Sequence, residues 1–235
     1  MILCANFKAN KTRQETRAYM AVVESFVSIN EIEDTIIVFP PFTALEHTPR
    51  NVLIGVQNAY PVSNGAFTGE IALEQLEEFD IKTILIGHSE RRHVLGETQE
   101  QIAEKFRFFS EQEFAIVYCV GEPLTVREQG NEALMHYIDD QFVGIDLSYP
   151  DLIVAYEPVW AIGTGLTPSN DEIEAVHTAL RLKSTAPLLY GGSVKVENAG
   201  EIMALSNVDG VLVGSASLSA NDFCEMIAQA AELAK

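Results

Sequence analysis

The sequence has few cysteines and few positive charges. Its three cysteines, Cys4, Cys119 and Cys224, lie far apart and form no Cys-x-x-Cys pair, so we predict neither a disulfide framework nor a zinc site. This usage fits a reducing, cytoplasmic compartment. Lys and Arg number 15 against 34 Asp and Glu, and the formal net charge is −19. Nucleic acids and anionic membranes bind through many Lys and Arg, so we expect neither as a partner.

Long apolar runs and low-complexity linkers are also missing. No apolar stretch approaches the length of a membrane span. The chain reaches Lys8 and Lys11 before any long apolar run, so we expect no targeting segment. Hydrophobic residues make up 47% of the chain, and no change in composition divides it. We therefore predict a single domain over residues 1–235.

Short apolar runs rich in β-branched residues recur along the chain, each followed by turn residues and a stretch of helical spacing. The predicted strands are Ile2–Phe7, Thr35–Phe39, Leu53–Gln57, Thr83–Ile86, Ala115–Cys119, Leu152–Tyr156, Pro187–Tyr190 and Gly210–Val213. These runs lack polar alternation, as expected for parallel strands covered on both faces. Eight β–α units predict an α/β fold that closes into a (β/α)8 barrel. A doubly wound open sheet would usually show a glycine fingerprint after the first strand, and residues 6–10 contain no glycine.

Unusual residues follow several predicted strands. In such a barrel the carboxyl ends of all strands meet at one mouth, where loops carry the chemistry. The residues at those ends are Asn6, Lys8, His88, Ser89, Glu90, Glu157, Gly191, Gly192, Ser193, Gly214 and Ser215. The small residues after the last two strands expose backbone N–H groups at helix starts, which predicts a phosphate site. Glycines that only permit tight turns are the alternative.

Three side chains at the mouth are candidates for acid–base chemistry. Glu157 ends an apolar strand, so we expect desolvation to raise its pKa and make it a general base, with a salt-bridged structural Glu as the alternative. His88 precedes a helix start that disfavours the protonated ring, although a capping His is the commoner case. Lys8 lies beside Asn6, and an ordinary exposed lysine is the alternative. Farther on, residues 161–165 are small and glycine-containing, and they predict a lid rather than an ordinary surface loop.

Seven segments together resemble one known family. They are Asn6-Phe7-Lys8, residues 65–70, 87–92, 119–122, 155–165, 190–194 and 210–218. They run in family order across nearly the whole chain and resemble the triosephosphate isomerases, whose fold is the TIM barrel. The resemblance implies a glycolytic and gluconeogenic isomerase that interconverts dihydroxyacetone phosphate and D-glyceraldehyde 3-phosphate through an enediol(ate), without a cofactor or metal.

The resemblance also implies roles for individual residues. Glu157 moves the proton, neutral His88 hydrogen-bonds the substrate oxygens, and Lys8 and Asn6 stabilise the developing charge. Glu90, as a buried acid beside Lys8 and His88, supports them together with Ser89. The phosphate binds the amides of Gly163, Ser193, Gly214 and Ser215. The lid comprises Pro158, Val159, Trp160, Ala161, Ile162, Gly163, Thr164, Gly165, Leu166, Thr167 and Pro168.

The segment 65–70 implies a homodimer, because in the family this loop enters the neighbouring subunit and brings Thr68 near its Asn6 and His88. Two departures from the family pattern stand out. Leu166-Thr167-Pro168 replaces a common Lys-Thr-Ala. Because proline fixes one backbone angle, the sequence does not predict the amplitude or the rate of hinge motion in the lid. Ser215 replaces a glycine but keeps its amide.

Other functions are compatible with a phosphate-binding barrel. They are a sugar-phosphate aldolase with a Schiff-base lysine, an aminoaldose isomerase with two acidic groups, and a barrel that has lost catalysis and acts as a binding or scaffold protein. The presence of Lys8, His88 and Glu157 favours the isomerase.

Overall fold

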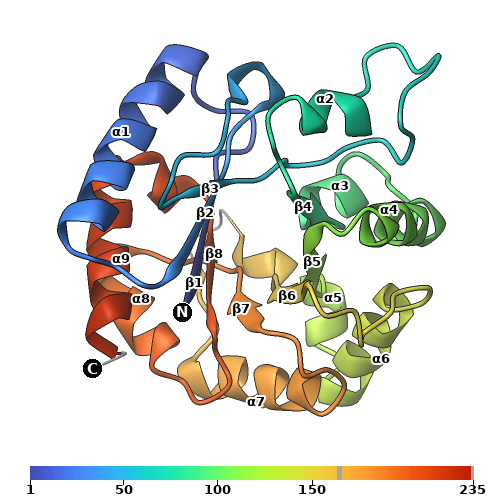
Figure 1. Cartoon of the computed structure of the whole chain (residues 1–235). Helices are drawn as coiled ribbons and strands as arrows, with labels where there is room; N and C mark the ends of the chain where they lie inside the picture. The colour runs from blue at the N-terminus through green and yellow to red at the C-terminus, as the bar shows by residue number, and fades with distance from the viewer. Residues whose placement is uncertain (163–165, 234–235) are drawn as a thin grey trace.

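The structure is a computed structural model that describes residues 1–162 and 166–233. Eight parallel strands form one sheet in the order β3-β2-β1-β8-β7-β6-β5-β4 (Figure 1). The strands are β1 (Ile2–Asn6), β2 (Thr35–Phe39), β3 (Leu53–Ile54), β4 (Thr83–Ile86), β5 (Ala115–Val120), β6 (Leu152–Tyr156), β7 (Leu188–Tyr190) and β8 (Gly210–Val213). A parallel bridge between Val56 and Ile84 joins the two ends of this order. The prediction of a (β/α)8 barrel is confirmed.

Helices surround the strands (Figure 1). The α-helices are α1 (Arg13–Ile29), α2 (Leu73–Glu77), α3 (Ser89–His93), α4 (Gln99–Glu111), α5 (Leu124–Arg127), α6 (Asn131–Gln141), α7 (Asn170–Arg181), α8 (Val196–Met203) and α9 (Ala220–Leu233). Short 3-10 helices are η1 (Phe42–Ala44), η2 (Val159–Ala161) and η3 (Ser215–Leu218). No helix within the described residues is long and apolar enough to cross a membrane.

Capping boxes set the starts of three long helices. Thr12, Thr98 and Ser169 each accept a backbone N–H three residues on, and a Glu or Gln at that position returns the bond. In α7 this box begins a helix of 12 residues. The segment from Asn170 to Arg181 is therefore a regular helix.

The third strand is shorter than the predicted Leu53–Gln57. Gly55 still donates to Val38 of β2, but the Val56 N–H donates to Thr83 of β4. The chain therefore changes partner at Gly55, where an added Cβ would lie 2.3 Å from the Phe39 ring. This change of partner interrupts the regular ladder, so β3 ends at Ile54 and Gln57 lies outside it.

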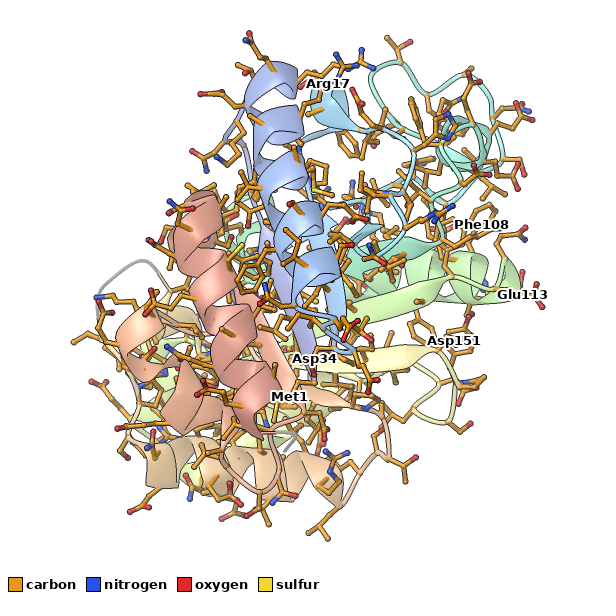
Figure 2. All side chains as sticks on the ribbon, turned by 60° about the vertical axis from the view of Figure 1, so that its left-hand side comes forward. Met1, Arg17, Asp34, Phe108, Glu113 and Asp151 are labelled. Carbon is orange, nitrogen blue, oxygen red and sulfur yellow. The ribbon has the colours of Figure 1, made fainter. Side chains whose placement is uncertain are left out.

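Apolar side chains cover both faces of the sheet. Inside the barrel, Cys4, Phe39, Cys119 and neighbouring strand residues form one cluster, and a larger cluster fills the space between strands and helices. This two-sided burial explains the apolar runs without alternation. The three cysteines are free and buried. At the amino end of the barrel, the N-terminal ammonium contacts Asp34, and Figure 2 shows Met1 and Asp34 close together.

Candidate active site

A pocket of about 600 Å³ lies at the carboxyl end of the strands. Residues predicted from strands 1, 4, 6, 7 and 8 line it together, namely Asn6, Lys8, His88, Glu157, Gly191, Gly192, Ser193, Gly214 and Ser215. Because parallel strands all end at the same edge, residues more than 200 positions apart meet here. The predicted strand-end residues therefore meet at one mouth of the barrel.

Glu157 is buried and has both carboxylate oxygens hydrogen-bonded or paired. Its Oε2 accepts the backbone N–H of Ser89 at 2.9 Å, and its Oε1 lies 3.1 Å from Nε2 of His88. Burial raises the pKa of Glu157, but His88, the Ser89 N–H and Lys8 outweigh burial and lower the pKa below its ordinary value. The expected raised pKa is wrong, because this buried carboxylate is not unpaired.

His88 is also buried, and its two ring nitrogens face different groups. Its Nδ1 accepts the backbone N–H of Glu90 at 3.2 Å, which leaves Nε2 to carry the proton toward Glu157 in the neutral ring. Burial lowers the pKa of His88, whereas the Glu157 carboxylate raises it, and the net shift is upward, opposite to the direction predicted from the helix start. This upward shift depends on Glu157 facing Nε2, so the ring becomes less basic when that carboxylate moves away.

Lys8 has a left-handed backbone with φ of 52°. Its N–H donates to the side-chain oxygen of Asn6 at 2.9 Å, and its carbonyl accepts from Nε2 of Gln57 at 2.8 Å. Gln57 donates to Phe39 O as well, at 2.9 Å. These bonds hold an unfavourable conformation that directs the lysine into the pocket. The sequence prediction did not include Gln57, although a polar residue at the end of the third predicted strand was a usable signal.

Glu90 and Ser89 support the site in different ways. Glu90 accepts a hydrogen bond from Lys8 Nζ at 2.7 Å and lies 3.8 Å from His88 Nδ1. Its position beside both residues agrees with the resemblance. Its side chain is 45% exposed, however, so the implied buried acid is wrong. Ser89 contacts Glu157 through its backbone N–H.

The predicted phosphate residues border the pocket near Lys8. Gly214 precedes η3, and a Cβ at Gly214 would lie 3.7 Å from Lys8 Nζ. Ser193 and Ser215 line the same cavity. The arrangement offers backbone amides and one ammonium to an anionic group. Within the described residues, no group of three His, Cys, Asp or Glu could hold a metal ion.

The stem of the predicted lid packs against Glu122. Trp160 Nε1 donates to Glu122 Oε1 at 3.0 Å, and the Glu122 side chain is fully buried. Ile162 lines the pocket. Gly163, Thr164 and Gly165 lie outside the described residues, so the phosphate contact expected at Gly163 is not described. Beyond them, Pro168 is buried.

The loop before α2 extends away from the barrel (Figure 1). Thr68 is exposed, and Phe67 is 41% exposed while its ring packs on Tyr60 at 4.5 Å between centroids. Gly65 and Gly69 have positive φ, which shapes this projection. An apolar side chain at the tip of a projecting loop is typical of a protein contact.

Known proteins match the chain over its whole length. The family model described as Triosephosphate isomerase matches residues 1–230. A protein of Sulfurimonas denitrificans named triosephosphate isomerase is 58% identical over 235 residues, covering 100% of this chain and 98% of the relative. Proteins of the same name from Wolinella succinogenes and Helicobacter pylori are 54% and 46% identical, and they cover 97% and 96% of this chain and 99% and 97% of their own lengths. With a pocket that unites the family's motif residues, the chain belongs to the triosephosphate isomerase family.

Proposed function

We propose that the protein is a triose-phosphate isomerase that interconverts dihydroxyacetone phosphate and D-glyceraldehyde 3-phosphate, a reaction of glycolysis and gluconeogenesis. The observation that carries this proposal is the meeting of Glu157, His88 and Lys8 in one pocket bordered by small residues at two strand ends. Membership of the family gives the substrate class.

Glu157 is the proposed base. It takes a proton from the carbon beside the carbonyl, and the electron pair moves to the carbonyl oxygen to form the enediolate. To reach that carbon, Glu157 gives up its contact with His88, which removes the carboxylate that raises the pKa of that ring. Neutral His88 then donates Nε2–H to the substrate oxygens. Return of the proton to the neighbouring carbon gives the other triose phosphate.

Lys8 and Asn6 are the proposed electrostatic partners of the enediolate. The ammonium of Lys8 lies between Glu90 and Gly214, so it can serve both the developing charge and the phosphate. Amides of Ser193, Gly214, Ser215 and Gly163 complete the proposed phosphate site. In a protein of net charge −19, attraction of a dianion must come from such local groups.

Further parts of the proposal concern assembly and motion. We infer a single domain, a cytoplasmic location and a homodimer in which the loop bearing Thr68 enters the partner. The exposed Phe67 supports the dimer. A lid over residues 158–168 would exclude water from the enediolate. The stem contact of Trp160 with Glu122 gives this segment a fixed base.

The rival functions fit the site less well. A Schiff-base aldolase needs a neutral lysine amine, and Lys8 is ion-paired with Glu90 at 2.7 Å. An aminoaldose isomerase needs two acidic groups at the substrate. A scaffold barrel has no use for a buried Glu–His pair, which is costly to bury without function.

A coupled assay with purified protein tests the proposal in both directions. We expect turnover with either triose phosphate, and Glu157→Asp, which withdraws the carboxylate by one methylene, should lower kcat strongly, by about 100-fold or more. Its urea midpoint should change little. Absence of turnover in the native protein, or an undiminished rate in the variant, would contradict the assignment. Borohydride trapping with substrate should give no adduct, and an adduct would favour the aldolase.

A further inference from the structure

Residues 120–122, which comprise the last residue of β5 and the turn that follows it, are hydrogen-bonded to the segment that carries Glu157. The carbonyl of Val120 accepts the N–H of Glu157 at 2.7 Å, and the carbonyl of Glu122 accepts the N–H of Val159 at 3.0 Å. These two bonds lie on either side of the proposed base. The position of the turn therefore sets the position of the Glu157 backbone.

Gly121, in the middle of this turn, contacts the Glu157 peptide directly. A Cβ added to Gly121 would lie 1.8 Å from the carbonyl oxygen of Glu157. Real atoms cannot approach so closely, so the glycine backbone itself fills the space. Any displacement of the Gly121 peptide is therefore transmitted to Glu157 by direct contact.

The side-chain amide of Gln141 holds the Gly121 peptide. Its Oε1 accepts the Gly121 N–H at 2.8 Å, and its Nε2 donates to the Gly121 carbonyl at 2.9 Å. The Gln141 residue is only 6% exposed, and both bonds are buried. One side chain thus satisfies both polar groups of a buried peptide, as a paired strand would.

Gln141 is itself fixed, because it is the last residue of α6 and its backbone carbonyl is held by other side chains. Nε2 of Gln99 donates to this carbonyl at 2.8 Å, and the hydroxyl of Tyr118 on β5 also donates to it. These contacts tie the end of α6 to β5 and the start of α4. The residue whose side-chain amide binds Gly121 is therefore itself held in place by hydrogen bonds.

We propose that Gln141 is a positioning residue for the base, holding Gly121 so that the Glu157 backbone stays where its carboxylate faces the substrate. The inference rests on the proposed isomerase function. Gln141 does not line the pocket, so it acts through the turn rather than on the substrate. Loss of its amide leaves a buried N–H and a buried C=O without partners, and the turn shifts to recover them.

The first test compares two variants that remove the same kind of bond at opposite ends of the barrel. Gln141→Met keeps the side-chain length and removes both hydrogen bonds. The control is Ser184→Ala, because Ser184 Oγ donates to Leu147 O and accepts from Ala186 N, both at 3.1 Å, near the amino end of β7. Both variants should lose stability, which urea denaturation measures.

Only the Gln141 variant should lose catalysis. We expect kcat to fall between about 10-fold and about 100-fold in Gln141→Met with KM nearly unchanged, since positioning acts on the reacting geometry. Ser184→Ala should keep kcat within about two-fold of the native value. Equal kcat values in the two variants, or a change confined to KM, would overturn the proposal.

A second variant keeps the test valid if Gln141→Met folds poorly. In Gln141→Glu the ionised carboxylate can accept from the Gly121 N–H but repels the Gly121 carbonyl, whereas the protonated acid can donate to it and restores the original pair. The ratio of variant to native kcat should therefore rise as pH falls from about pH 9 to about pH 5, because a carboxyl held against a carbonyl oxygen protonates more readily than an exposed one. A ratio independent of pH would overturn the role of Gln141.

If the native protein shows no isomerase turnover, the proposed function and the role built on it both fail. If the native protein turns over and Gln141→Met matches the serine control, the function stands and only the role of Gln141 is refuted.

Discussion

Replacement of Gln57 by methionine should expose how much the site depends on the backbone conformation of Lys8. The variant keeps the length of the side chain and removes the amide that donates to the carbonyls of Lys8 and Phe39. Phe39 O retains the N–H of Phe7 at 3.1 Å, so the main loss falls on Lys8. Released from this bond, the lysine can leave its left-handed conformation.

The size of the effect follows from two contributions. A left-handed backbone costs a non-glycine residue about 1 kcal/mol, and the lost hydrogen bond contributes about another 1 kcal/mol net, because Lys8 is only partly buried. Together they favour relaxation by about 2 kcal/mol, which corresponds to a factor of about 30 in population. We therefore expect kcat/KM to fall by up to about 30-fold.

The coupled isomerase assay measures this change, and Gln129→Met is a matched control. Gln129 is exposed and its Nε2 donates to a backbone carbonyl, that of Thr125, at 2.8 Å. The control should retain full activity. Native kcat/KM in Gln57→Met would show that Lys8 keeps its conformation without the amide, and the strain argument would then be wrong.

Three further predictions concern pH, packing and assembly. Burial lowers the pKa of His177 below its usual 6.5, so its contribution to stability is intact above about pH 6.5 and is lost as pH falls toward the folded pKa. The urea midpoint should drop between about pH 7 and about pH 5.5, and a drop of the same size in His177→Gln would contradict this assignment. Gly121→Ala would place a methyl carbon 1.8 Å from the Glu157 carbonyl oxygen and should cost about 3 kcal/mol in urea denaturation, whereas a negligible cost would refute the close approach. Phe67→Asp should convert the proposed dimer to a monomer in sedimentation velocity, while the control Leu182→Asp, at an 87% exposed side chain, should not, and a persistent dimer in the first variant would count against this contact.

The sequence predicted the fold well because the relevant signals are local. Eight apolar runs marked the strands, and the residues after them fell at one mouth because parallel strands end together. The third strand was overestimated, since its apolar pattern does not reveal that the chain changes partner at Gly55. The seventh strand was predicted to begin at Pro187, one residue before β7 begins at Leu188.

The electrostatics of the site were less predictable. Against the effect of burial, the pKa of Glu157 is lowered first by His88 and then by the backbone N–H of Ser89, and no spacing rule reports contacts with residues so far away in the chain. The exposure of Glu90 depends on the direction of its side chain from α3. Gln57 and Gln141 act through hydrogen bonds between their side-chain amides and backbone atoms of distant segments. These contacts become visible only in the three-dimensional structure.

The pairing of β1 with β8 has a consequence for how the chain is made. Ile2 to Ala5 pair in register with Gly210 to Val213, so β1 stays without one of its neighbours until the segment of β8, more than 200 residues later, has left the ribosome. During that interval its open edge can template wrong pairings, and closure depends on contacts of very long sequence separation, which form slowly. Closure of the barrel therefore has to wait until β8 has been made and covers the open edge of β1.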